Sequence, residues 1–283
     1  MGGGIAVRGN LMAVAFSAAK GHVILVDVEA RARVTAWRLP DGEAGWSDAT
    51  GVAMDERYHV FVADAHNDRV LEYAPFGRFV RAFGVPPPEA GDAGRDRPGV
   101  LDKPHAVAVR GDLLYVACGE QPRRRGVQRL SRRGTVLRPL ACRGDAAAKF
   151  GAPRGLWADA EGVVVADTLR GELSEYRGDG AFMRASRTAP AGSARPVGVA
   201  RDAAGNCWFV ADGVVRRLAQ AGAALPPPAA VAGEVRDAVA IALDAAGRLY
   251  VLDRHGERVL RFGADGAFDG VWFDVATVGA PKS

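Results

Sequence analysis

Residues 60–73 read VFVADAHNDRVLEY, which is two short apolar runs around a polar centre. The first run ends at Asp64, and the second begins after Arg69. Short runs rich in Val, Phe and Tyr that are separated by Asp and Asn predict two antiparallel strands joined by a turn. The polar centre has two interpretations: the start of a catalytic site, or a turn that the chain uses many times.

The same pattern recurs along the chain, which favours the second interpretation. The residue that ends the first run serves as a marker, and it recurs at intervals of 41 to 54 residues. The marker in the six copies is Phe16, Asp64, Cys118, Asp167, Asp212 and Asp253. One apolar run precedes each marker, as GVAM at 51–54 does, and two more follow it. Four strands in a unit of about 45 residues are typical of a propeller blade.

The sequence therefore predicts an all-β protein, a six-bladed β-propeller with four antiparallel strands per blade. We expect residues 1–283 to form one domain. The expected blades span residues 4–40, 48–84, 103–142, 152–188, 195–232 and 237–274. The last copy contains all four apolar runs, so we expect the ring to close by packing between blades and not through a strand shared by the two ends.

The blades resemble those of the NHL-repeat family. Its pattern reads roughly P-x-G-[IV]-A-V-D, then G-x-[LI]-Y-V-A-D, then N-x-R-[VI]. Blade two matches it best, with GVAMD and FVADAHNDRVLEY, and blade six follows with AIALDAAGRLYVLDRHGERVLRF. The resemblance covers nearly the whole chain and implies the propeller fold. It implies no single activity, because this architecture serves scaffolds, RNA-binding proteins and enzymes.

The amino-acid composition excludes few classes of globular protein. The hydrophobic fraction of 48% and the charged fraction of 25% are ordinary for a globular protein, and 36 glycines indicate many turns. The net charge is +4, and nearly all the positive charge comes from Arg in a chain rich in Ala and Arg. Because such composition is also typical of genomic bias, the charge is weak evidence for an anionic partner.

Cysteine usage and hydropathy bear on location. The three cysteines, Cys118, Cys142 and Cys207, form no CxxC motif, which favours reduced thiols and a cytoplasmic protein. No run of 18 apolar residues predicts a transmembrane helix, so we expect no membrane partner. The stretch LMAVAFSAA at 11–19 resembles a weak signal peptide, which leaves export open, but the repeat favours a strand of blade one.

A ligand site is expected where the innermost strands begin, which we call the top face. The residue just before the small first residue of each inner run is Gly3, Thr50, His105, Arg154, Val197 and Val239. These positions form a ring around the axis, where propellers are concave. The predicted ligand-binding residues are Thr50, His105 and Arg154 of this ring, with the markers Asp64 and Asp167.

Two of these assignments have structural alternatives. The guanidinium of Arg154 suits a carboxylate or phosphate, or it pairs with Asp167. Recurrence of the marker Asp favours a turn residue, because Asp accepts hydrogen bonds from nearby backbone N–H groups. Arg69 and Arg258 recur beside the markers, and we expect them to bridge between blades.

Two families of propeller enzymes offer comparisons. The run KPHAVAV around His105 is similar to Pro-His-apolar runs in peptidylglycine amidating lyases, a resemblance that implies zinc near the axis. Only His105 matches, and a catalytic zinc usually has three protein ligands. Gluconolactonase-like propellers use acidic residues and Asn within inner strands, which this chain lacks. We therefore assign no catalytic residue, metal or cofactor, and keep a metal-dependent lyase or hydrolase as an alternative.

A basic run offers a third interpretation. Residues 122–143 contain eight arginines and no acidic residue. The predicted polyanion patch is Arg123, Arg124, Arg125, Arg129, Arg132 and Arg133. Some NHL domains bind RNA through a basic surface, but this run has no aromatic residue to stack on bases. We therefore expect a scaffold that binds a protein, peptide or small anionic ligand on its top face, with nucleic acid as a weaker possibility.

Overall fold

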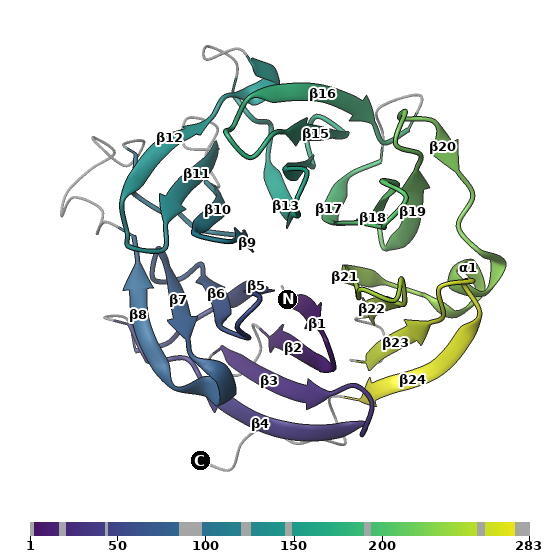
Figure 1. Cartoon of the computed structure of the whole chain (residues 1–283), viewed down its shortest axis with the longest axis horizontal. Coiled ribbons are helices and arrows are strands. Elements are labelled where there is room, and N and C mark those ends of the chain that lie inside the picture. The colour runs from purple at the N-terminus through teal and green to yellow at the C-terminus, as the bar shows by residue number, and fades with distance from the viewer. Residues whose placement is uncertain are drawn as a thin grey trace.

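The computed structural model is a ring of six four-stranded antiparallel sheets, which confirms the predicted six-bladed β-propeller (Figure 1). The structure describes residues 3–16, 21–42, 45–84, 98–119, 126–144, 149–189, 194–253 and 258–274. Within each blade the strands follow one another in chain order from the axis outward. The innermost strands are β1, β5, β9, β13, β17 and β21.

Blades one to three contain twelve strands. Blade one has β1 (Gly3–Arg8), β2 (Leu11–Phe16), β3 (His22–Asp27) and β4 (Ala32–Arg38). Blade two has β5 (Ala49–Met54), β6 (Val60–Asp64), β7 (Arg69–Tyr73) and β8 (Phe79–Phe83). Blade three has β9 (Ala106–Arg110), β10 (Leu113–Cys118), β11 (Gly126–Ser131) and β12 (Val136–Leu140). Residues 11–16 are thus a strand, as the repeat predicts.

Blades four to six repeat this arrangement. Blade four has β13 (Pro153–Ala158), β14 (Val163–Asp167), β15 (Glu172–Tyr176) and β16 (Phe182–Arg187). Blade five has β17 (Pro196–Arg201), β18 (Cys207–Ala211), β19 (Val214–Leu218) and β20 (Ala224–Leu225). Blade six has β21 (Ala238–Leu243), β22 (Leu249–Asp253), β23 (Arg258–Phe262) and β24 (Phe268–Asp274).

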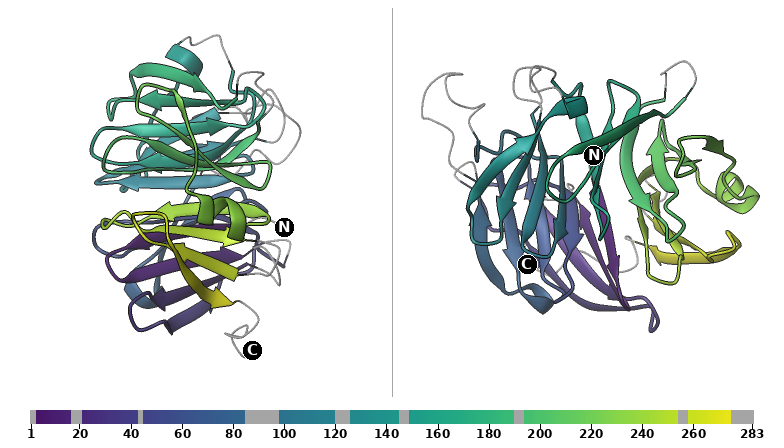
Figure 2. Two further views of the ribbon diagram at one scale, coloured as in Figure 1. Left: turned by 90° about the vertical axis from the view of Figure 1, so that its right-hand side faces the viewer. Right: turned by 45° about the horizontal axis from the view of Figure 1, so that its top comes forward.

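Helical segments are short. Two 3₁₀ turns occupy Pro75–Gly77 and Cys142–Gly144, and α1 spans Ala229–Glu234 after the two-residue strand β20. Helix α1 lies at the outer side of the ring between blades five and six (Figures 1 and 2), and Val231 anchors it in the core of that interface. In the described part of the chain, no helix combines the length and hydropathy needed to cross a membrane.

The hydrophobic core lies between the blades. Each of the six interfaces between neighbouring blades holds its own cluster of buried side chains. Strands β6 and β14 are buried at every residue because a blade packs against each of their faces. This two-sided burial explains why VFVAD and VVVAD read as continuous apolar runs and do not alternate with polar residues.

Small residues begin the inner runs because neighbouring strands approach closely at the axis. A Cβ on Gly4 would lie 2.7 Å from the backbone nitrogen of Val52, and one on Gly51 would lie 2.8 Å from the carbonyl oxygen of His105. Both distances are shorter than van der Waals contact, so a side chain at either position displaces the next blade. Glycine is therefore a packing requirement at these two positions of the ring.

Blade five corrects one sequence alignment. The predicted marker of this blade was Asp212, equivalent to Asp64. In blade two, Gly51 pairs with Ala63, and the marker Asp64 is the residue after Ala63. In blade five, the equivalent Gly198 pairs with Val210, and the residue after Val210 is Ala211. Ala211 therefore occupies the marker position. Asp212 and Gly213 instead form a two-residue hairpin turn with φ of 52° and 76°, which requires residues tolerant of positive φ.

The ring closes as expected, by packing between blade one and blade six. Each of these blades takes all its strands from one end of the chain. Their shared core includes Val14 and Tyr250. The Arg31 guanidinium lies 3.8 Å from the ring centroid of Trp272. At the surface, Arg248 Nη1 lies 2.8 Å from an oxygen of Glu29.

Candidate functional site

The top face is built by β-bulges. In blades two, four, five and six the inner strand carries one extra residue just after its start, and the pairing register shifts there. The extra residues are Thr50, Arg154, Val197 and Val239. A bulge re-aims a side chain that regular pairing would hold against a neighbouring sheet. Four members of the predicted ring are thus directed by the same local irregularity.

All six ring residues line one cavity of about 490 Å³ at the top of the axis. The cavity also contains Thr168, Arg195, Asp212 and Asp237, which the sequence analysis did not assign. A signal for two of them existed, because Arg195 and Asp237 each stand two residues before a ring residue. Asp212 was identified only as a marker of the repeat and was not assigned to the ligand site.

Beneath this cavity the axis narrows to an apolar layer. Its members all come from the second position of the inner runs, and each is buried. They are Ile5, Val52, Val107, Leu156, Val199 and Ile241. A ligand in the top cavity therefore meets charged groups at the rim and aliphatic side chains at the floor.

His105 and Arg154 are in direct contact. Arg154 Nη1 lies 2.7 Å from Nδ1 and 2.6 Å from Nε2 of His105. Burial, the Arg154 guanidinium and the Lys103 ammonium together lower the pKa of His105 to about 3. The imidazole is therefore neutral near pH 7, and the His105–Arg154 pair carries a single positive charge.

Asp64 and Asp167 do not line the cavity, although the sequence analysis placed them among the ligand-binding residues. Both are fully buried. Asp64 accepts hydrogen bonds from the Asp48 backbone N–H at 3.0 Å and from Arg69 Nε at 2.9 Å. Asp167 accepts from the backbone N–H groups of Gly151 and Ala152, and Arg170 is its ionic neighbour. These aspartates anchor the segment that leads into each inner strand.

The two threonines of the cavity also join blades. Thr50 Oγ1 donates to the carbonyl oxygen of Pro104 at 2.8 Å, and Thr168 Oγ1 donates to that of Pro196 at 2.6 Å. Each acceptor belongs to the chain that leads into the next blade. Because the hydroxyl protons are used in this way, these side chains offer a ligand only acceptor lone pairs.

The predicted polyanion patch is only partly available. Arg123, Arg124 and Arg125 lie outside the described residues. Arg132 reaches into blade two, where its guanidinium lies 2.6 Å from Asp55 and 2.7 Å from Glu72. Arg129 donates to the carbonyl oxygen of Gly178 and faces the Tyr115 ring. Arg133 is exposed.

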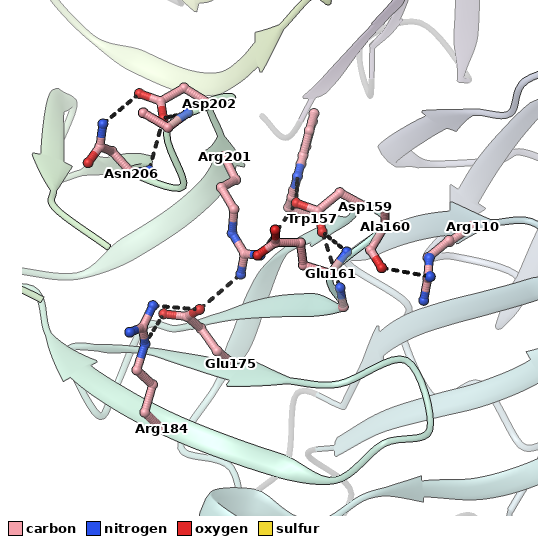
Figure 3. A network of polar contacts seen from close by, with 12 residues as sticks. Arg110, Trp157, Asp159, Ala160, Glu161, Glu175, Arg184, Arg201, Asp202 and Asn206 are labelled. Carbon is pink, nitrogen blue, oxygen red and sulfur yellow. Dashed lines mark hydrogen bonds and ion pairs between the residues drawn. The ribbon is translucent and has the colours of Figure 1, made fainter. Parts of the chain in front are cut away.

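A second cavity, of about 380 Å³, lies at the opposite end of the inner strands. Arg201 is its central buried charge, and Figure 3 shows its guanidinium directed at Glu175. The two groups are 3.0 Å apart, and Arg184 binds the same carboxylate through both of its oxygens. Asp159 lies 3.5 Å from Arg201 and accepts the indole N–H of Trp157.

Two further carboxylates of this lower cavity, those of Asp202 and Asp244, already have partners in the protein. Burial opposes ionisation of Asp202, but hydrogen bonds from Asn206 and Trp208 outweigh it and lower the pKa of the carboxyl. Asp244 accepts from Arg248 and Tyr250 in the same way. Because their oxygens already have partners in the protein, these groups are less suited to a ligand than those of the top cavity.

Comparison with known proteins supports the fold. No protein-family model matches the sequence, and no curated protein sequence does. Solved structures do match. A streptogramin B lyase is 13% identical with a TM-score of 0.65, and the match covers 96% of this chain and 83% of the lyase. A virginiamycin B lyase from Staphylococcus aureus is also 13% identical, with a TM-score of 0.64 and coverages of 94% and 82%. A chain of a nidogen/laminin complex is 15% identical, with a TM-score of 0.68 and 95% of each chain covered.

Proposed function

We propose that this chain is a binding propeller of the NHL type, which recognises a small ligand or a segment of a peptide or protein in its top cavity. The observation that carries the proposal is the set of four bulges that direct four side chains into one space. A bulge leaves a residue unpaired in the ladder, so its recurrence favours a use for the re-aimed side chains. A volume of about 490 Å³ falls within the range of small-molecule sites.

The arginine side chains of the cavity favour a ligand with an anionic group. Arg154 and Arg195 both line the cavity, and Arg195 is exposed. Arginine presents a planar fork of donors that binds carboxylate or phosphate with two hydrogen bonds. The neutral His105 adds no second positive charge, but its ring fills the space beside the Arg154 guanidinium and fixes its position.

The choice between binding and catalysis rests on the site, because the structurally similar proteins include lyases and a member of a protein complex. Over the described ranges, no three His, Cys, Asp or Glu side chains are grouped as metal ligands. At His105 the cationic guanidinium of Arg154 contacts the ring, which disfavours a metal ion by charge repulsion. These features support binding over the metal-dependent lyase or hydrolase.

The location of the protein forms part of the same proposal. All three cysteines, Cys118, Cys142 and Cys207, are free and buried. Buried thiols without disulfide partners are typical of proteins that work in a reducing compartment. We therefore retain the cytoplasm as the proposed location.

A cavity-filling variant tests the binding proposal. In Val239→Trp, an indole would occupy the top cavity, whereas in Val271→Trp it would lie on the exposed face of the outer strand β24. Both proteins are screened by ligand-observed NMR against small carboxylates, amino acids and short peptides. We expect ligands of the unaltered protein to lose at least tenfold in affinity with Val239→Trp and to bind Val271→Trp unchanged.

Circular dichroism and thermal unfolding of both variants establish that they are folded. Equal binding by the folded Val239→Trp variant would place the ligand elsewhere and overturn the proposal. A screen in which no compound binds the unaltered protein would overturn the small-ligand and peptide forms of it.

A further inference from the structure

Blade five leaves two charged side chains at the rim of the top cavity. In blades two, four and six the marker Asp is buried, and an Arg of the same blade lies beside it. In blade five the marker is Ala211, which needs no ionic partner. The shift by one residue moves the carboxylate of this blade to Asp212, in the turn, where it is exposed.

The local contacts of these two groups are few. Asp212 Oδ2 accepts one long hydrogen bond, 3.4 Å, from the backbone N–H of Arg195. The Arg195 guanidinium makes no ion pair with any residue in the described part of the chain. Both side chains line the cavity. An exposed carboxylate and guanidinium that are not committed to each other are available to a ligand that supplies both partners.

The remaining charges of the rim are divided by side. Asp237 adds a second carboxylate near the blade-five turn, because its Oδ1 lies 3.0 Å from where a Cβ on Gly213 would stand. Arg154 supplies positive charge on the other side, against His105 of blade three. Blades three and six face each other across the axis (Figure 1). The cavity therefore has the Arg154 cation on the side of blades three and four, and two carboxylates together with the Arg195 cation on the side of blades five and six.

From this division we infer that the ligand is zwitterionic: a small molecule with one carboxylate and one ammonium group, such as an amino acid or a short free peptide. The inference rests on the proposed function, since it names the ligand class of the same cavity. The carboxylate binds Arg154 and Arg195, and the ammonium group binds Asp212 and Asp237. Val197 and Val239 provide apolar contact for small aliphatic side chains.

Three related probes test this inference by isothermal titration calorimetry. Alanyl-alanine carries both charges, N-acetyl-alanyl-alanine carries only the carboxylate, and alanyl-alanine amide carries only the ammonium group. We expect the zwitterion to bind at least tenfold more tightly than either blocked form. We also expect Asp212→Asn to weaken binding of the zwitterion about tenfold and to leave binding of the acetylated probe unchanged, because only the former contacts this carboxylate.

Asp179→Asn is the matched control, since Asp179 lies exposed in the turn between β15 and β16. It should leave all three titrations unchanged. If the acetylated probe binds as tightly as the zwitterion, the site recognises anions alone; the inference then fails while the proposed function stands. If none of the three probes binds and Val239→Trp changes nothing in the screen, both fail together.

Discussion

At the residue scale, His105 shows how neighbouring charges set the protonation of a side chain. Its ring is partly buried at the top cavity, with Arg154 in contact and Lys103 two residues away in the sequence. Burial removes the water that stabilises an imidazolium, and each cation adds repulsion. The pKa of about 3 follows from these effects acting in one direction.

This pKa makes stability depend on pH. The unfolded chain takes up a proton at His105 near pH 6.5, whereas the folded protein does so only near pH 3. Between these values the unfolded state binds more protons, so acidification lowers the free energy of unfolding. The limiting slope is about 1.4 kcal/mol per pH unit, or about 2 kcal/mol in total between pH 7.5 and pH 5.

Urea unfolding of the wild type and His105→Asn at several pH values measures this effect. The carboxyl groups titrate alike in both proteins and cancel in the comparison. We expect the wild type to lose about 2 kcal/mol more than the variant between pH 7.5 and pH 5. Parallel curves over this range would show that the folded protein protonates the imidazole as readily as the unfolded chain does, which would contradict the lowered pKa.

The repeat pattern does not predict the direction of the Trp157 side chain. In the other five inner runs the third residue is an alanine, which packs in the interface with the next blade. These residues are Ala6, Ala53, Ala108, Ala200 and Ala242. Trp157 breaks the pattern, lines the lower cavity and donates to Asp159. The break is visible in the sequence, but the direction of the indole depends on contacts with blades five and six.

At the scale of elements, strand patterns were predictable and their offsets were not. The runs that became β5, β6 and β7 are predictable as short apolar runs bounded by turn residues. Sequence alone does not show that CWFVA, and not WFVAD, aligns with VFVAD, because both are apolar and both end near Asp. Only pairing with Gly198 decides between them. The bulges at the ring positions could not be predicted for a similar reason, because a residue left unpaired in a ladder has no characteristic amino-acid type.

The end of β11 joins two blades, and this contact is testable. Arg132 has 16% of its side chain exposed and meets two carboxylates of blade two that are almost fully buried. Removing the cation leaves the buried Asp55 carboxylate without this partner, whereas Glu72 keeps Arg81 at 3.1 Å. We expect Arg132→Gln to lower the free energy of unfolding by about 3 kcal/mol.

The adjacent Arg133 provides the control for Arg132, because it is exposed. Arg133→Gln should change the free energy of unfolding by less than about 0.5 kcal/mol. Chemical denaturation of both variants under one buffer condition makes the comparison. Similar small effects for the two substitutions would contradict a structural role for Arg132. Its side chain would then again be a candidate for binding a polyanion.

At the scale of the whole molecule, closure of the ring depends on side chains alone. Trp272 of β24 is central to this interface, with Arg31 of blade one on one face and Arg261 lying 3.2 Å from its ring centroid. Its side chain is buried beside Val14 and Tyr250. Between blades one and six no described strand is exchanged, so packing supplies the stability of the closure.

Truncating Trp272 measures that stability. We expect Trp272→Ala to lower the free energy of unfolding by about 3 to 5 kcal/mol, because it removes a large buried side chain and both stacking contacts. Val271→Ala is the neighbouring control, since Val271 is 45% exposed and should cost less than about 1 kcal/mol. If denaturation curves of the two variants coincide, closure rests on other contacts.

Closure by packing also affects how such a ring is made. Every blade is one uninterrupted run of chain, so a nascent blade can pair its four strands as soon as they have left the ribosome. No strand waits for a distant partner, which keeps most contacts local and limits the time that a bare sheet edge is exposed to other chains. The contact between blades one and six, where β21 lies beside β1, requires no further strand pairing.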